Sequence, residues 1–372
     1  MKKFSTLFRR SSFYSLNFSL SSKPLHIRAY KPVIFQPSKF SDLSFFKKAK
    51  HSTGQCCDIM DLAPTLKTVV KRLEEFAPLS LAESWDNVGL LINPPESNNT
   101  KIKTIFFTND LTERVLEEAI KESANLIISY HPPLFKALKK ITQRTWKERI
   151  VAKCLREGIA LYSPHTCWDA VSGGVNDWLA GALPSGKIKP IIPIKTYGPN
   201  KFSYKVHFDY LAPAVDPKSG LEKLEKDYFG SIRQRYASKN GTGRLYELDK
   251  PATIQELIDG IKKHVNLPKL QVALAVNHTL ADRVKKIAIC AGSGASVLNG
   301  VAAQIYLTGE MSHHEVLEAN HNDATVILTH HSNSERGFLK VFAQKLSEDL
   351  KKDNFVIKTI ISSTDKDPLT IM

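Results

Sequence analysis

The sequence predicts an α/β fold with two related halves, each built on a mostly parallel sheet. From about Met60 onward, apolar runs typical of buried strands alternate with segments of helical periodicity. This alternation is the pattern of βαβ units, in which a helix connects two parallel strands. It stops after Pro184 and resumes after Pro251, so a second half of similar layout follows the first. A chain of 372 residues is long enough for two domains.

The first half opens with a helix at residues 63–78, because Leu66, Val69, Leu73 and Phe76 fall on one stripe. A turn and a strand follow at 84–92. The alternation then predicts strands at 103–110, 125–131 and 159–165, and helices at 111–123, 145–158 and 173–183.

The second half begins with a helix at 253–265. Its expected strands, with helices between some of them, are at 270–276, 284–290, 303–309, 324–331 and 354–362. The intervening stretch from Pro184 to Pro251 is rich in proline and charge, and we interpret it as an inter-domain connection or a small insertion. The predicted organisation is a leader at 1–59, an N-terminal half at 60–190, a linker or short insertion at 191–250 and a C-terminal half at 251–372.

Most of the positive charge lies at the N-terminus. The net charge is +15, but residues 1–55 carry eleven Lys or Arg and one acid, Asp42, which leaves +5 for the rest. A basic segment rich in Ser and Phe is typical of a mitochondrial transit peptide. There are two alternatives to a transit peptide: the segment is a disordered leader, or translation starts at Met60. We therefore expect a mitochondrial or cytoplasmic protein, with the nucleus as a further option.

Composition argues against several classes of protein. The body is only mildly basic and shows no basic stripe, so we predict no specific DNA binding. No apolar run reaches the length of about 18 residues that a membrane-spanning helix needs. The five cysteines are odd in number and form no CxxC pair. This argues against a disulfide framework or a cysteine zinc site, and favours a reducing compartment.

Three apolar runs, at 127–133, 161–170 and 326–337, each end in side chains of the kind that bind metals. Because ligands bind at the carboxyl ends of strands in open α/β sheets, these side chains are expected to meet. Imidazole and carboxylate together suit zinc, iron, nickel or manganese. The candidate ligands are His131, His165, Asp169, His331 and Glu335.

The spacing of these residues supports the metal interpretation. His165 and Asp169 are four residues apart, as are His331 and Glu335, which on a helical turn places each pair on one face. A structural histidine at a strand end is the common alternative for each position taken alone. Glu335 also precedes a predicted helix, where an acid is favoured by the helix dipole.

Two other motifs are weaker candidates. His313 and His314 are adjacent on a predicted helix that Ser312 caps, so their side chains point about 100° apart and do not suit one ion. We expect one of them either to contact a metal ligand without binding the ion, or to lie on the helix surface. The motif at residues 290–296, CAGSGAS, could cradle an anion with its backbone amides, but a tight structural turn is favoured.

Taken together, the motifs resemble the Nif-three-like family (Ngg-one-interacting factor three), whose bacterial members are often described as type-two GTP cyclohydrolase homologues. The match runs from about Asp61 to the C-terminus and looks closest to the animal members. It rests on LAESWDNVGLLI, TNDLTERVLEEAI, SYHPPLFK, TWKERIV, CAGSGASVL, LTGEMSHHEVLEA, HSNSERGFL and the tail STDKDPL.

The resemblance implies a pair of metal ions in the cleft between the two halves. The family's ligands fall on His131, Asp169, His331 and Glu335, with Glu335 bridging both ions. The remaining family histidine falls on Tyr130, and a neutral phenol is a poor ligand for most divalent ions. His165 is not a ligand in that pattern, and we assign it a role in proton transfer.

The predicted function is that of a metal-dependent hydrolase that uses one or two divalent ions and acts on a nucleotide or a related heterocycle. One alternative is a transcriptional co-regulator, or protein-interaction factor, with a structural or sensory metal. Another is a mitochondrial protein that handles a metal or cofactor. Because bacterial relatives form ring-shaped hexamers, the resemblance also implies a homo-oligomer, either dimer or hexamer.

Overall fold

The computed structural model describes residues 62–95, 100–194 and 239–369, all within one compact unit, Met60–Met372. The predicted leader and residues 195–238 lie outside the described part of the chain. The boundaries of the two halves therefore stay a prediction.

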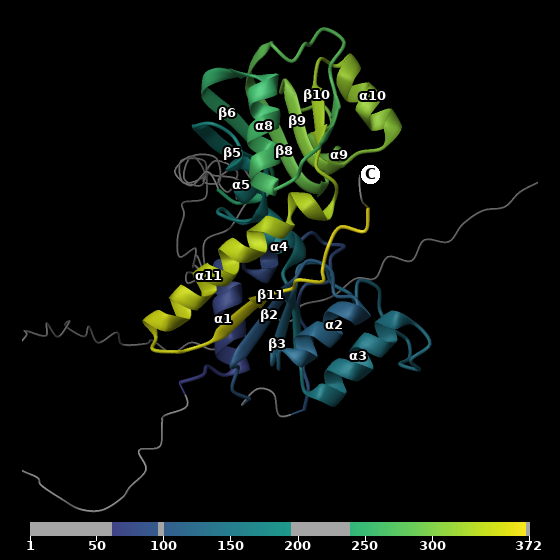
Figure 1. Cartoon of the computed structure of the whole chain (residues 1–372), viewed down its shortest axis with the longest axis vertical. Helices are drawn as coiled ribbons and strands as arrows, with labels where there is room; N and C mark the ends of the chain where they lie inside the picture. Colours follow the sequence, from purple (N-terminus) through teal and green to yellow (C-terminus); the bar gives the residue numbers. More distant parts are fainter. Residues whose placement is uncertain (1–61, 96–99, 195–238, 370–372) are drawn as a thin grey trace, which may run out of the picture. The chain divides into compact units, whose positions relative to one another are not determined.

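The first sheet has the strand order β1-β4-β3-β2-β11. Only β1 is antiparallel to its neighbour, and the other pairs are parallel. The last strand of the chain pairs with β2, far from it in sequence, as the yellow arrow beside β2 shows (Figure 1). The strands are β1 (Gly89–Ile92), β2 (Thr104–Thr108), β3 (Leu126–Ser129), β4 (Ala160–Ser163) and β11 (Lys358–Ile361).

Helices cover both faces of the first sheet, which explains why β2, β3 and β4 are continuous apolar runs. On one face, α2 (Glu113–Lys121) and α3 (Trp146–Glu157) pack through Val115 and Ile150 against Phe106 and Ile127. The other face packs against α1 (Leu66–Phe76), the short α4 (His165–Ala170) and α11 (Arg336–Lys352).

The second sheet is mixed, with the order β5-β6-β8-β9-β10-β7. The β8–β9 and β9–β10 pairs are parallel, whereas β5–β6, β6–β8 and β10–β7 are antiparallel. The expectation of mostly parallel pairing thus describes the first sheet and the centre of the second. The strands are β5 (Gly186–Pro193), β6 (Gly241–Thr253), β7 (Gln271–Ala273), β8 (Arg283–Ser293), β9 (Ile305–Glu310) and β10 (Thr325–Leu328).

The sequence pattern missed β5 and β6. Their residues are largely exposed or half-buried, so they lack the continuous apolar run of a buried strand. The remaining elements are short helices and turns, together with the helices around the second sheet. They are η1 (Leu79–Leu81), α5 (Val175–Ala180), α8 (Ile254–Val265), α9 (Ala295–Leu298), α10 (His313–His321) and η4 (Ser332–Ser334).

One continuous core joins the residues under both sheets. Trp168 of α4 packs at a tilt against Phe342 of α11, with ring centroids 4.3 Å apart, and meets Phe338 edge to face at 5.3 Å. Arg244 of β6 is buried and pairs with Asp177 of α5, and it also donates to four backbone carbonyls. These contacts fix the second sheet against α4 and α5, which follow the carboxyl end of β4.

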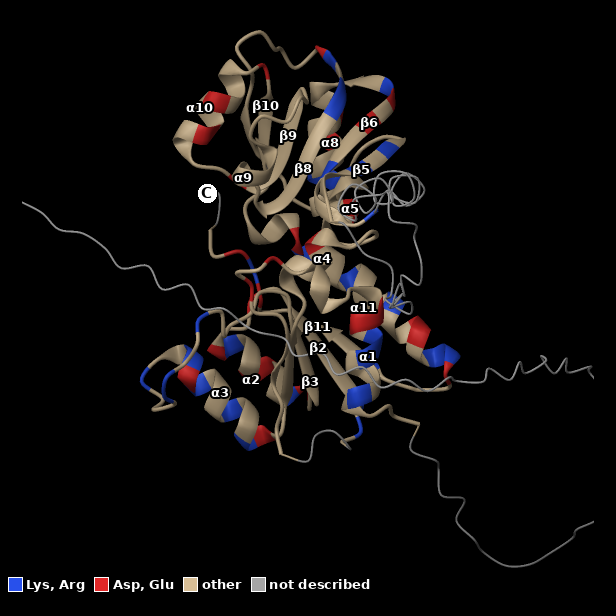
Figure 2. Cartoon of the chain, turned by 180° about the vertical axis from the view of Figure 1, so that it is seen from behind, with Lys and Arg blue, Asp and Glu red and all other residues tan. Residues whose placement is uncertain are grey.

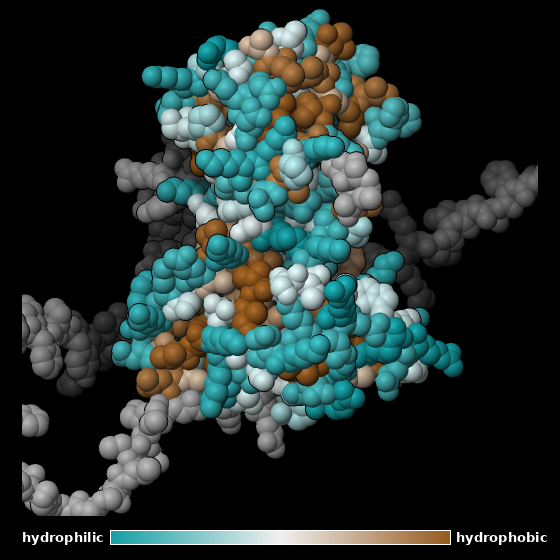
Figure 3. Space-filling view, in the orientation of Figure 1, coloured by the Kyte–Doolittle hydropathy of each residue, from teal (hydrophilic) through white to brown (hydrophobic). Residues whose placement is uncertain are grey.

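The surface shows no basic stripe in the view of Figure 2, where blue and red residues alternate along α3 and α11. Figure 3 shows apolar residues gathered at the top of the view, over the ends of β9 and β10. Exposed apolar side chains after β7 include Leu274, Val276 and Leu280. In the described residues, no helix is both long and apolar enough to cross a membrane.

Candidate metal centre

The site forms where strands of both sheets end. His131 lies two residues beyond β3, and Asp110 lies two residues beyond β2. Glu310 is the last residue of β9, and His331 follows β10. Glu335 directly precedes α11. The strand-end rule for open α/β sheets therefore places the polar residues of several strands in one place.

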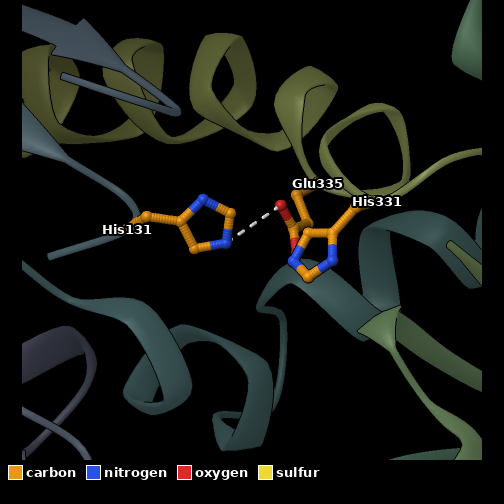
Figure 4. Close-up of side chains that lie close together, drawn as sticks. All are labelled: His131, His331 and Glu335. Atoms are coloured by element: carbon orange, nitrogen blue, oxygen red, sulfur yellow. Dashed lines mark ion pairs between the residues drawn. The ribbon is translucent and has the colours of Figure 1, made fainter. Parts of the chain in front are cut away.

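Glu335 lies close to two imidazoles, one at each carboxylate oxygen. Its Oε2 is 3.5 Å from Nε2 of His131, and its Oε1 is 3.5 Å from Nε2 of His331. Figure 4 shows both rings close to the carboxylate, and their centroids are 5.2 Å apart. The carboxylate is only 2 % exposed. Ligand atoms of the three residues lie within 4.8 Å of one another, and in the described residues this is the one such group of His, Cys, Asp or Glu.

Each histidine is held from behind by a second carboxylate. Oδ1 of Asp110 is 2.9 Å from Nδ1 of His131, and Oε1 of Glu310 is 2.8 Å from Nδ1 of His331. A carboxylate at Nδ1 keeps the proton there and leaves the lone pair on Nε2, which is the usual arrangement of metal-binding histidines. Sequence reasoning missed Asp110 and Glu310, although both obey the same strand-end rule.

An irregularity of β8 at Gly292, where the register with β9 shifts, makes room for the carboxylate. Gly292 has φ +66°, and a Cβ on it would lie 2.7 Å from Oε1 of Glu335 and 3.2 Å from Nε2 of His331. Its backbone N–H donates to Oγ of Ser334 at 2.7 Å. The CAGSGAS motif is therefore the irregular end of β8 leading into α9, and not the tight turn expected from the sequence; its Gly292 leaves room for the Glu335 carboxylate.

The donor set fits a divalent cation. Burial lowers the pKa of His131, but the charge of Glu335 and the hydrogen bond with Asp110 together raise it to about 11. The surroundings thus favour positive charge strongly. Oδ1 of Asn109 is buried without a hydrogen-bond partner in the described residues, while its Nδ2 donates to Oε2 of Glu335 at 3.1 Å. Two imidazoles and a carboxylate suit zinc, iron, manganese or nickel.

Tyr130 and Asp169 form a separate pair. The Tyr130 hydroxyl donates to Oδ1 of Asp169 at 2.5 Å. Burial and the charge of Asp169 raise the pKa of Tyr130 well above its ordinary value, so the phenol stays neutral. Burial is also the main cause that raises the pKa of Asp169 to about 6. The structure thus brings His131, His331 and Glu335 together, and the ligand roles of Asp169 and Tyr130 stay predictions.

His165 opens onto a cavity beside this centre. Its Nδ1 is 2.7 Å from Oδ1 of Asp86, a residue that sequence reasoning did not single out. Its ring centroid is 5.2 Å from that of His131. Both histidines line a cavity of about 490 Å³, together with Phe135, Trp146, Lys147 and Lys366 among other residues.

His313 and His314 lie outside the group. Both are exposed on α10, where Ser312 and Glu315 form the predicted capping box. His314 lines a different cavity, of about 290 Å³.

Comparison with known proteins decides the family. The model of the family Duf34/NIF3 (NGG1p interacting factor 3) matches residues 64–368. The chain belongs to this family. The resemblance inferred from the motifs is therefore confirmed.

Relatives in other organisms support an animal-type member. NIF3-like protein 1 of Drosophila melanogaster is 45% identical over 304 residues, covering 82% of this chain and 88% of the relative. The human protein of the same name is 40% identical over 353 residues, covering 82% and 92%. NGG1-interacting factor 3 of Saccharomyces cerevisiae is 33% identical over 318 residues, covering 82% and 96%.

Solved structures share the fold. A Bacillus cereus protein related to NIF3 has a TM-score of 0.65 at 21% identity, covering 83% of this chain and 100% of its own. Reduced HcgD from Methanocaldococcus jannaschii has a TM-score of 0.58 at 22% identity, covering 81% and 98%. At this identity the likeness shows the fold alone.

Proposed function

We propose that this protein is a hydrolase that depends on a divalent metal and acts on a nucleotide or a related heterocycle. The observation that carries the proposal is the Glu335 carboxylate, each oxygen of which lies 3.5 Å from the Nε2 of one imidazole. A cavity of about 490 Å³ reaches one of these imidazoles, that of His131, and this volume is in the range of small-molecule sites.

His131, His331 and Glu335 would hold the metal. A divalent ion there supplies Lewis-acid activation of water and of the substrate oxygen at neutral pH. Asp110 and Glu310 contact Nδ1 of the two rings and orient them, which is the usual role of carboxylates behind metal-binding histidines. A second ion would need Asp169, and Tyr130 where the family has a histidine, which is why we propose one ion or two.

His165 is placed to move a proton. Asp86 engages its Nδ1, and its Nε2 makes no hydrogen bond with the described residues. An imidazole that is oriented on one nitrogen can accept or give a proton at the other, which is the usual arrangement of a general base. Its position on the cavity wall beside His131 supports this role.

The cavity suits a substrate that carries negative charge and a flat ring. Lys147 and Lys366 line it, as do Thr112, which caps α2, and Trp146, the first residue of α3. The N-terminal ends of two helices and two ammonium groups attract an anion. Phe135 and Trp146 are exposed at the cavity and offer apolar faces to a ring.

The test is to assay the purified protein with zinc, manganese or iron against nucleoside mono-, di- and triphosphates. We expect turnover in the wild type, loss of turnover in Glu335→Ala, and a fall of about 10²- to 10⁴-fold in kcat with retained metal in His165→Ala. Glu315→Gln, which alters an exposed helix cap, is the control. Turnover that never exceeds the Glu335→Ala background, with any metal, would contradict the proposal.

A protein-interaction role is the second candidate. It is supported by the name of the yeast relative, NGG1-interacting factor 3. In this case the metal is structural or sensory, and a transcriptional co-regulator is the partner class. A double variant, His331→Ala with Glu335→Ala, would then restore a deletion phenotype as well as wild type does. Failure of that rescue would count against a metal-independent role.

The basic leader supports a mitochondrial location, which we propose together with handling of a metal or cofactor there as the third candidate. Imaging a C-terminal fusion with and without residues 1–55 tests it. We expect mitochondrial signal only for the complete chain, and cytosolic signal from both would contradict it.

A further inference from the structure

We propose that residues 362–369, here called the C-terminal strap, are a positioning element of the metal centre. The strap follows β11, and in Figure 1 it is the yellow coil that leaves this strand toward the chain end. It contacts the residues that flank or orient the three ligands. The inference rests on the metal site and does not require hydrolysis.

The strap begins at an anchor on α2. The Glu118 carboxylate accepts hydrogen bonds from the hydroxyls of Ser362, Ser363 and Thr364 at 2.6, 2.7 and 2.6 Å. It also accepts from the backbone N–H groups of Ser363 and Thr364 at 2.8 and 3.2 Å. Five donors on one carboxylate fix the path of the strap as it leaves the sheet.

The middle of the strap reaches both sides of Glu335. Asp365, whose side chain is 4 % exposed, pairs with Nη1 of Arg336 at 2.5 Å and accepts from the backbone N–H of Asn109 at 2.7 Å. Arg336 directly follows Glu335 in the sequence. The Nδ2 of Asn109 donates to Oε2 of Glu335 at 3.1 Å. One strap carboxylate thus ties down two neighbours of the bridging ligand.

The far end of the strap reaches the second histidine. Asp367 accepts from Oγ of Ser332 at 2.7 Å, and Ser332 is the residue after His331. Oγ of Ser332 in turn accepts from Nη2 of Arg336 at 2.9 Å. Asp365 and Asp367 are therefore connected through Arg336 and Ser332.

The strap also lies between two cavities at the metal centre. Thr364, Asp365 and Lys366 line the cavity of about 490 Å³, whereas Asp367 and Leu369 line a second cavity of about 370 Å³. Asp110, His131 and Pro368 line both. The strap therefore determines from which sides His131 can be reached.

A simple tie-down of the chain end is the alternative, and it predicts a different result. Contacts that only fasten the chain end stabilise the folded state. Their loss lowers the free energy of unfolding without changing the affinity of the folded protein for metal. A positioning element holds ligand atoms in place, and loss of such outer contacts typically weakens metal affinity about 10- to 100-fold.

The experiment measures zinc affinity by chelator competition and the visible spectrum of the cobalt-loaded protein, using the complete chain. The test variants are Glu118→Gln, Asp365→Asn and Asp367→Asn. Glu122→Gln is the matched control, because Glu122 is the C-cap of the same helix and pairs with Lys358 of β11, outside the strap. Asp353→Asn, which breaks an exposed pair with Arg72, controls for loss of an ion pair.

We expect affinity to fall about 10- to 100-fold in the strap variants, with an altered cobalt spectrum and no change in either control. Should Glu118→Gln fail to fold, Asp367→Asn decides alone, since its contact is with Ser332. Affinity in the strap variants equal to that of Glu122→Gln overturns the inference but leaves the proposed function standing. A wild type that binds no metal overturns both.

Discussion

Oδ1 of Asp110 lies 2.9 Å from Nδ1 of His131, on the opposite edge of the ring from Glu335. The ring thus contacts two carboxylates that have different tasks. Asp110 orients the ring through Nδ1, and Glu335 lies beside Nε2, the nitrogen that would bind the metal. Glu310 and His331 repeat the arrangement at 2.8 Å. The centre is built as two oriented imidazoles around one buried carboxylate.

Asp110→Asn should therefore weaken metal binding about 10- to 100-fold, because the amide fails to fix the tautomer that leaves Nε2 free. Zinc titration against a chelator measures it. Asp259→Asn, on the exposed side of α8, is the control and should bind as wild type does. Equal affinity in both variants would show that Asp110 does not orient the ring.

Tyr130→His should raise the number of ions bound per chain, because it restores an imidazole beside Asp169. Tyr130→Phe is its matched control, since it removes the hydroxyl without adding a ligand. We expect elemental analysis to show occupancy rising toward two ions in Tyr130→His alone. If both variants bind as many ions as wild type, Tyr130 does not limit the second position.

Gly292→Ala should weaken metal binding more than about tenfold, because its Cβ would lie 2.7 Å from Oε1 of Glu335 and displace that carboxylate. Changes in residues that orient metal ligands typically weaken metal affinity by this amount. Gly300→Ala is a close control: its φ of +73° carries the same backbone cost of about 1–2 kcal/mol, yet its Cβ would meet nothing within 4 Å. Both variants should unfold more easily in urea, and only Gly292→Ala should lose zinc. Loss of zinc in both would mean that backbone strain alone is responsible.

The stability that the Glu118 anchor contributes to the fold should depend on pH. Burial raises the pKa of Glu118, but the hydrogen bonds from Ser362, Ser363 and Thr364 lower it to about 2, below its ordinary value. A lowered folded-state pKa means stability that is present above the unfolded pKa and is lost as the pH falls through the folded one. The free energy of unfolding of wild type should exceed that of Glu118→Gln by about 2 kcal/mol at pH 7, a figure that discounts the pKa change because solvent screens the partly exposed carboxylate.

This difference should shrink between about pH 4.5 and pH 2, which denaturant titrations across that range measure. Glu122→Gln should show a smaller difference at pH 7, since an exposed ion pair contributes at most about 1 kcal/mol. If the difference in free energy of unfolding between wild type and Glu118→Gln does not change with pH, the Glu118 carboxylate does not stabilise the fold in its charged form.

The sequence was sufficient to predict the three clustered side chains that follow apolar runs. His131, His331 and Glu335 follow buried strands, and topology alone brings such ends together. Asp110 and Glu310 carried the same signal and were missed, because an acid after a strand is also common in ordinary turns. The exposed strands β5 and β6 were missed for lack of a continuous apolar run.

Contacts between distant segments could not be predicted. Asp86 and His165 lie 79 residues apart, and Glu118 and Thr364 lie 246 apart. Nothing in local periodicity relates such positions, since only the folded sheet order places β11 beside β2 and carries the strap to the centre. Local patterns predicted the three candidate ligands, whereas the residues that contact them from other segments required the structure.

The most direct test of the metal centre is the metal content of the complete protein, purified without added metal and then titrated with zinc, beside Glu335→Ala. Glu335 is the residue shared by both imidazoles, so its loss should remove the site. We predict at least one tightly bound divalent ion per chain in wild type and none in Glu335→Ala. No bound metal in wild type, or equal binding by the variant, would contradict the account.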